Sequence, residues 1–63
     1  MTVRDFIGTV AEYVTVRVEG LRDFDYEVLA VHDGRRIIPE EFLDRKVLWV
    51  FADWDAKAIV LQI

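Results

Sequence analysis

The spacing of the apolar residues changes once in this 63-residue chain, near Val14, from the period of a helix to the period of a strand. Before that point, apolar residues recur three and four positions apart, which places them on one face of a helix. These residues are Val3, Phe6, Ile7, Val10 and Val14. From Val14 to Val18, apolar and polar residues alternate instead, as in a half-buried strand. The chain is therefore expected to begin with a helix and continue as a sheet.

Turn and capping signals divide the rest of the chain. Asp33-Gly34 favours a hairpin, because a type I′ turn needs a positive φ at both central residues. Pro39 suits the first turn of a short second helix, with Glu40 and Glu41 at the positive end of its dipole. Runs of adjacent strands are typical of the α+β class.

The sequence thus predicts a single α+β domain over residues 1–63. An N-terminal helix at about 2–13 should pack on an antiparallel sheet of four to five strands, with a short helix at about 39–44. The strands are expected at about 14–19, 24–32, 35–38, 47–53 and 58–63.

The last two predicted strands are apolar on both faces. One face would carry Trp49, Phe51, Ile59, Leu61 and Ile63, and the other Leu48, Val50, Ala52 and Val60, joined by Leu29 and Val31. One helix covers only one face of a sheet, so an apolar patch should remain. The chain is 54% hydrophobic. It has no cysteine and only one histidine, so it lacks the disulfides or metal site that usually stabilise small domains. Either its core is dense or a second chain covers the patch.

Net charge and hydropathy limit the classes of partner and the cellular compartments that are expected for this chain. Twelve acidic against eight basic residues give a net charge of −4, which argues against direct binding of nucleic acid or of anionic membranes. The longest apolar run, Val47 to Ala52, is far shorter than the roughly 20 residues of a membrane span, and no signal peptide is evident. The absence of cysteine fits a reducing compartment, so we expect a cytoplasmic protein.

Residues for catalysis or metal binding are scarce. The chain has no Ser, Cys or Asn, and its single histidine, His32, precedes Asp33 in a predicted strand end, where neighbours point to opposite faces. Two Asp-x-Asp pairs, at 23 and 25 and at 53 and 55, supply too few oxygens for calcium and fit turn chemistry instead. The sequence therefore predicts no enzyme, no catalytic or metal-binding residue and no cofactor.

Candidate partner-binding residues lie at two predicted turns. Glu19, Asp23, Asp25 and Glu27 form an acidic stretch, which either mimics nucleic-acid phosphates or forms cross-strand ion pairs with Arg35 and Arg36. Trp54, between two aspartates in a turn, is expected to be exposed and to act as an interface anchor. The predicted partner-binding set is Trp54, Asp23, Asp25, Glu27, Asp53 and Asp55.

The segment Ile38 to Val47 resembles an I-P-E-E-Φ-L-D-x-x-V signature of small phage and prophage proteins, which also open with a T-V-x-x-Φ-I helix like residues 2–7. The resemblance implies an origin in a mobile element and carries over no functional residue. In size, acidity and origin the chain is similar to anti-CRISPR proteins. We therefore expect a non-enzymatic protein-binding module, most concretely an inhibitor of a host defence protein such as a CRISPR effector, which is itself a nucleic-acid-binding protein. The alternative is a homodimeric structural or regulatory protein.

Overall fold

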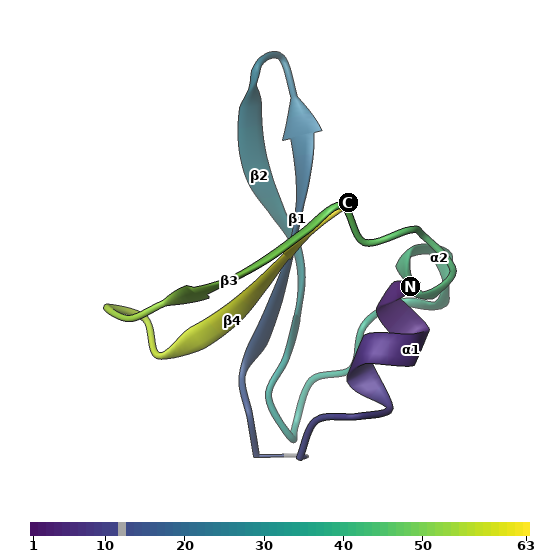
Figure 1. Ribbon diagram of the computed structural model, residues 1–63, viewed down its shortest axis with the longest axis vertical. Coiled ribbons are helices and arrows are strands. Elements are labelled where there is room, and N and C mark those ends of the chain that lie inside the picture. Colours follow the sequence, from purple (N-terminus) through teal and green to yellow (C-terminus); the bar gives the residue numbers. More distant parts are fainter. Residues whose placement is uncertain (12) are drawn as a thin grey trace.

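The computed structural model describes residues 1–11 and 13–63 and contains, in that part of the chain, two short helices and a four-stranded sheet (Figure 1). The elements are α1 (Val3–Ile7), β1 (Val16–Arg22), β2 (Asp25–His32), α2 (Glu40–Leu43), β3 (Trp49–Asp53) and β4 (Ala58–Gln62). The predicted α+β class is confirmed. The two helices lie on the same side of the molecule, and the two hairpins β1–β2 and β3–β4 extend from it as two arms.

The sheet is mixed rather than wholly antiparallel as predicted. Its strand order is β2-β1-β4-β3, with antiparallel pairs in both hairpins and a parallel pair, β1 with β4, at the centre. The connection through α2 lets β4 return beside β1 in the same direction. Parallel strands are normally buried on both faces. Val16, Val18 and Leu61 are fully buried on one face of this pair. On the other face only Val60 is fully buried, beside the half-buried polar residues Arg17, Glu19 and Gln62, so the condition is met completely on one face.

The first helix is shorter than predicted, ending at Ile7 instead of residue 13. Its predicted cap is present: the Thr2 hydroxyl accepts a hydrogen bond from the Asp5 N–H, and the Asp5 carboxylate accepts one from the Thr2 N–H. The helix stops because Gly8 is a poor helix former and the Thr9 hydroxyl donates to the Phe6 carbonyl, which competes with the next helical turn. Of the remaining predicted helix, Glu12 lies outside the described residues.

The predicted strand at 35–38 does not join the sheet. The Asp33 carboxylate accepts hydrogen bonds from the N–H groups of Arg35 and Arg36 and pairs with the Arg36 guanidinium at 2.6 Å. These local bonds satisfy backbone groups that a strand ladder would otherwise need. Gly34 has a positive φ of 85°, but Asp33 does not, so these two residues do not form the predicted type I′ hairpin and the segment is instead a loop that delivers Ile38 to the core. The hairpin turn lies earlier, at residues 23 and 24, and β1 continues beyond its predicted end at residue 19 to Arg22.

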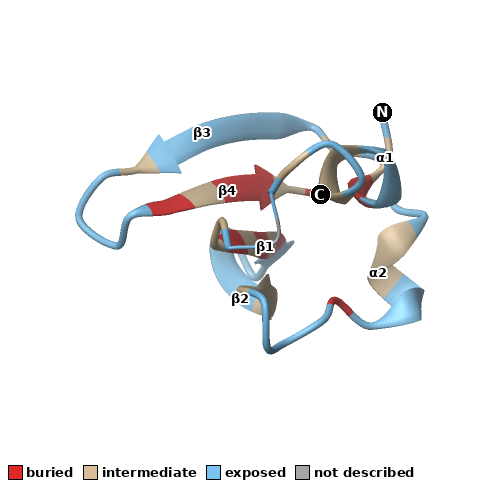
Figure 2. Ribbon diagram, turned by 90° about the horizontal axis from the view of Figure 1, so that it is seen from below, coloured by how far each residue is buried: buried red, intermediate tan, exposed pale blue. Residues whose placement is uncertain are grey.

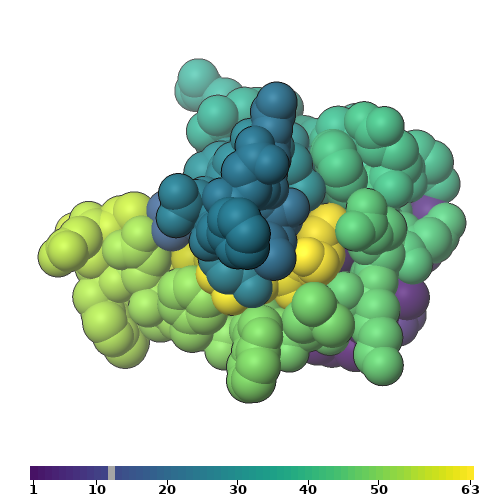
Figure 3. All heavy atoms as spheres, turned by 90° about the horizontal axis from the view of Figure 1, so that it is seen from above, coloured from purple at the N-terminus to yellow at the C-terminus, as the bar shows by residue number. Residues whose placement is uncertain are grey.

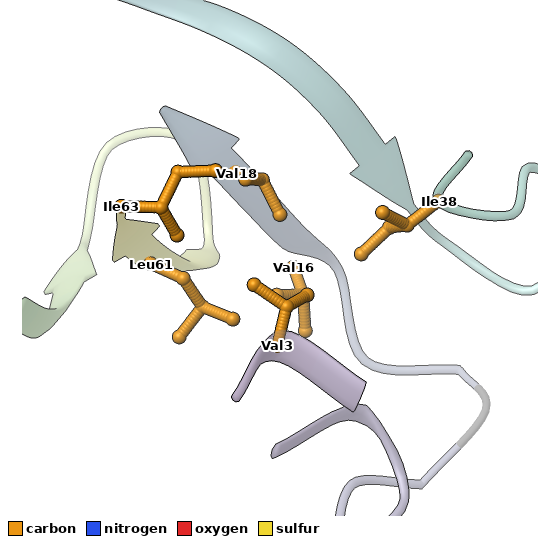
Figure 4. Packing of buried hydrophobic residues seen from close by; sticks show 6 residues of the cluster. All are labelled: Val3, Val16, Val18, Ile38, Leu61 and Ile63. Atoms are coloured by element: carbon orange, nitrogen blue, oxygen red, sulfur yellow. The ribbon is translucent and has the colours of Figure 1, made fainter. Parts of the chain in front are cut away.

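One face of the sheet, the inner face, packs against the helices and holds the core. The buried cluster comprises Val3, Val16, Val18, Ile38, Leu61 and Ile63 (Figure 4). Within residues 1–11 and 13–63, no helix lies over the opposite face, which we call the outer face.

The predicted division of the last two strands between faces is wrong in part. Phe51 lies opposite Val60 and Trp49 lies opposite Gln62, so both aromatic residues are on the outer face. Leu61, which was predicted to share their face, is on the inner face. The cause is the register: the Asp53–Ala58 pair that closes the hairpin sets odd residues of β3 against even residues of β4.

Candidate protein-binding site

Each of the two hairpins ends in the same three-residue pattern, an aromatic residue between two aspartates. The β1–β2 hairpin ends in Asp23, Phe24 and Asp25, and the β3–β4 hairpin reverses after Asp53 through Trp54 and Asp55. Phe24 is 96% exposed and Trp54 is 85% exposed, the two highest values among the exposed large hydrophobic residues. The predicted exposure of Trp54 is confirmed. We call these two segments the Phe24 tip (residues 23–25) and the Trp54 tip (residues 53–55).

The backbone at the Phe24 tip is strained. β1 and β2 are joined by only two residues, and both have positive φ, 50° at Asp23 and 74° at Phe24, as a type I′ turn demands. Glycine, asparagine or aspartate normally occupies such positions, so Asp23 is ordinary there. The Phe24 side chain, in contrast, collides with the following carbonyl at a cost of about 1–2 kcal/mol. The Phe24 ring recovers none of this cost by burial, since it is almost wholly in solvent.

The backbone at the Trp54 tip is held by Asp53. One oxygen of the Asp53 carboxylate accepts a hydrogen bond from the Ala56 N–H at 3.1 Å, and the other accepts one from Arg17 Nη2 at 2.8 Å. The Arg17 guanidinium, with help from the Ala56 N–H, lowers the pKa of the Asp53 carboxyl. Asp53 therefore stabilises the turn through Ala56 and contacts Arg17 on the outer face, whereas Trp54 and Asp55 are exposed to solvent.

The acidic residues near the Phe24 tip remain accessible. Asp23, Asp25 and Glu27 are all exposed, and Glu27 makes only a long contact of 3.4 Å with the exposed Arg22. The expected pairing with a strand carrying Arg35 and Arg36 does not form, because Glu27 lies opposite Gly20 of β1 and Arg36 binds Asp33 instead. That guanidinium holds the pKa of Asp33 at about 2.

The six predicted partner-binding residues thus form two groups in different places. Asp23, Asp25 and Glu27 lie on the β1–β2 arm, and Asp53, Trp54 and Asp55 on the β3–β4 arm. Figure 1 shows the two arms pointing in different directions, and Figure 3 shows the β1–β2 arm (dark blue) projecting toward the viewer while the other turn (yellow-green) lies at the far left. The structure brings together the members of each group, but not the two groups.

An apolar hollow of about 460 Å³ lies beside the Trp54 tip. It is lined by Val14, Ala52, Asp53, Trp54, Lys57, Ala58 and Ile59. Its size falls in the range of small-ligand sites, but such sites also present several convergent polar groups. Here the lining is almost wholly apolar, which suits an apolar side chain of a partner better than a reacting substrate.

A network of four polar side chains crosses the middle of the outer face. Arg17 donates to Glu19 at 2.9 Å and to Asp53 at 2.8 Å, and the Gln62 amide donates to Glu19 at 3.2 Å. Asp53 first, and Glu19 with it, raise the pKa of the half-buried Arg17. The network ties β1 to β4 and to the end of β3, so it fixes the position of the β3–β4 arm relative to the β1–β2 arm.

No protein family, curated protein or solved structure matches this chain. Within residues 1–11 and 13–63, no three metal-ligating side chains gather into a group that could hold an ion. The same part of the chain contains no helix with the length and hydropathy to cross a membrane.

Phe24 is the candidate that the sequence interpretation missed. The sequence pattern places Phe24 at the start of a strand, where an aromatic residue is ordinary. The available signal was the repetition of Asp-aromatic-Asp at residues 23–25 and 53–55, since the same reasoning that favoured an exposed Trp54 applies to both.

Proposed function

We propose that this chain is a non-enzymatic protein-binding module that contacts its partner through the Phe24 tip and the Trp54 tip. The observation that carries the proposal is the exposure of Phe24 and Trp54 at the ends of two projecting hairpins, each between two aspartates. Aromatic residues bring large apolar area to an interface and dominate binding energy when they enter a pocket.

The strain at Phe24 supports a role in binding. A residue in a sparsely populated region of φ and ψ persists only where the surrounding structure holds it, and such residues gather at functional sites. Here the strain raises a large apolar side chain to the end of a hairpin, where it stabilises nothing within its own fold. A partner that buries the ring would compensate for that cost.

The carboxylates indicate the chemistry of the partner. Asp23, Asp25 and Glu27 would favour a partner with a basic surface. Opposite charges would raise the rate of association with such a partner, and the carboxylates would repel acidic proteins. Together with the resemblance to small phage proteins, this supports the concrete form of the proposal: an inhibitor that binds a host defence protein such as a CRISPR effector, whose nucleic-acid-binding surface is basic.

Binding can be tested with immobilised protein and host lysate. We expect the wild-type chain to retain a partner that Phe24→Gly and Trp54→Gln variants retain at least tenfold less well, with each variant folded by circular dichroism. Ile37→Asn is the matched control, because Ile37 is also a highly exposed apolar residue but lies away from both tips. Equal capture by all four proteins would contradict the assignment of the tips.

The inhibitory role needs a separate assay. Expression of the chain in cells that carry an active CRISPR system should restore plaque formation by a targeted phage, and the Phe24→Gly variant should not. If plaques stay suppressed across the known CRISPR types while the capture experiment succeeds, the module binds a different host protein.

A further inference from the structure

The two edges of the sheet differ in how well they are protected against pairing with another strand. β2 carries Asp25, Glu27 and His32, and its register shifts at Val18 and Glu19 of β1, which leaves Leu29 without a partner as a bulge. Charges and bulges are the features that keep natural edge strands from pairing. β3, in contrast, is regularly paired and has no charge or proline from Trp49 to Ala52.

The outer side of β3 is open. Trp49, Val50, Phe51 and Ala52 are all exposed, and Figures 1 and 2 both show no described segment beside the outer edge of β3. Its one charged residue, Asp53, is already paired with Arg17 of the same chain. An edge strand with these properties is a template for another strand.

The hydrogen bonds of β4 show which backbone groups of β3 are free. The N–H groups of Ile59 and Ile63 donate to β1, so the alternate residues of β4 turn their backbone groups toward β3. One of these, Val60, lies opposite Phe51. The backbone groups of Phe51 therefore face β4, and those of its neighbours Val50 and Ala52 point outward from the sheet.

We propose that the β3 edge binds the β3 edge of a second copy of this chain, antiparallel and centred on Phe51. Phe51 is the middle residue of β3, so a two-fold axis there places Val50 of each copy opposite Ala52 of the other. The outward N–H and C=O groups of these two residues then form two reciprocal pairs of hydrogen bonds. The two Phe51 rings meet on the outer face as a cross-strand aromatic pair, and the two sheets become one of eight strands.

Exposed apolar area favours a second copy as the occupant, and Trp49 to Ala52 carry no charge that would repel that copy. Trp49 is 65% exposed and Phe51 is 44% exposed. With full side-chain areas of roughly 250 Å² for Trp and 200 Å² for Phe, these fractions correspond to roughly 250 Å² of exposed apolar area per copy. If both side chains became wholly buried, two copies would thus supply at most about half of the roughly 1,000 Å² that a specific interface needs. Leu48 and Val50, also exposed, and the paired backbones add to it. The net charge of −4 does not oppose this contact, because Val47 to Ala52 are uncharged.

Disulfide trapping tests the register directly, since the chain has no cysteine of its own. Residues opposite each other in a non-hydrogen-bonded antiparallel pair have Cα atoms about 4.5 Å apart, within the roughly 4.4–6.8 Å of a disulfide. Phe51→Cys should therefore form a covalent dimer under mild oxidation. Trp49→Cys is the control on the same face: its two copies would lie four residues apart along the strands, roughly 13 Å. Equal trapping at both positions, or none at position 51, would overturn the register.

Sedimentation of the unmodified chain tests the dimer itself. We expect a dissociation constant of roughly 10 μM or tighter. Val50→Pro removes an outward N–H that the monomer does not use, so the variant should stay folded and become monomeric, with dimer affinity at least tenfold weaker. Val50→Thr keeps the N–H and should leave the dimer intact. A wild-type chain that is monomeric at millimolar concentration, or a Val50→Pro variant that dimerises as well as Val50→Thr, refutes the proposal. Both tests use the purified chain alone, so they are independent of the capture experiment.

Discussion

Replacing Phe24 by glycine should make this domain more stable, although it removes the largest exposed apolar side chain of the β1–β2 hairpin. Glycine adopts a φ of 74° without the steric cost of about 1–2 kcal/mol that a side chain meets there. This gain is partly offset, because glycine has greater conformational freedom in the unfolded chain, which lowers the stability of the fold by about 0.5–1 kcal/mol. The ring is 96% exposed, so the lost burial amounts to roughly 10 Å², or about 0.2 kcal/mol. The net gain is about 0.5 kcal/mol.

The measurement is urea unfolding followed by circular dichroism, at a protein concentration low enough to suppress any association. The Phe24→Gly variant should unfold at higher urea with an unchanged m-value and melt about 2–4 °C above the wild type. Phe24→Ala is the control, because it removes the ring but keeps the Cβ that causes the strain, so its stability should match the wild type. The reasoning fails if Phe24→Gly is less stable than Phe24→Ala. A stabilising change that also abolishes partner capture would show that Phe24 is kept for binding and not for the fold.

Three further predictions concern the core and the charged groups. Leu61→Ala should cost about 2–5 kcal/mol, about half of the roughly 3–9 kcal/mol expected for a chain of this length, so the variant should melt at a much lower temperature in calorimetry. Arg17→Met should cost about 1–3 kcal/mol in urea unfolding, because it leaves the half-buried Glu19 without its cation, and Glu19→Gln in the same chain should recover part of that loss. The pKa of Asp33 is depressed to about 2 and that of Asp53 is lowered, so both carboxylates stabilise the fold above their unfolded pKa of 3.8. Stability should therefore fall as the pH drops from about 4 toward 2, and an unchanged urea midpoint across that interval would contradict the assignment.

The sequence was sufficient for the features that depend on local chemistry. The α+β class, the cap formed by Thr2 and Asp5, and the exposure of Trp54 each follow from residues close together in the chain, and each is found.

The features that failed depend on contacts between distant residues. No local pattern distinguishes a parallel from an antiparallel partner for β1, because Val16 and Val18 read as an ordinary alternating strand. The end of α1 was misplaced for a related reason: Val10 and Val14 do pack against the core, as their spacing suggested, but from a turn rather than from a helix. In the candidate site, the sequence predicts all three residues of the Trp54 tip. It does not predict the 96% exposure of Phe24, because an aromatic residue at a strand end is more often packed than exposed.

The parallel pairing of β1 with β4 determines how this domain folds. Each hairpin needs only local contacts and can form in about 1–10 μs, but neither has its buried side covered until the two meet. That meeting joins residues such as Glu19 and Gln62, which are 43 positions apart, and closing such a loop costs roughly 3 kcal/mol beyond a constant. We therefore expect docking of the two hairpins to be the slow step of folding. Since Val16, Val18 and Leu61 are buried by that same event, the domain should fold and unfold as one cooperative unit with no stable half.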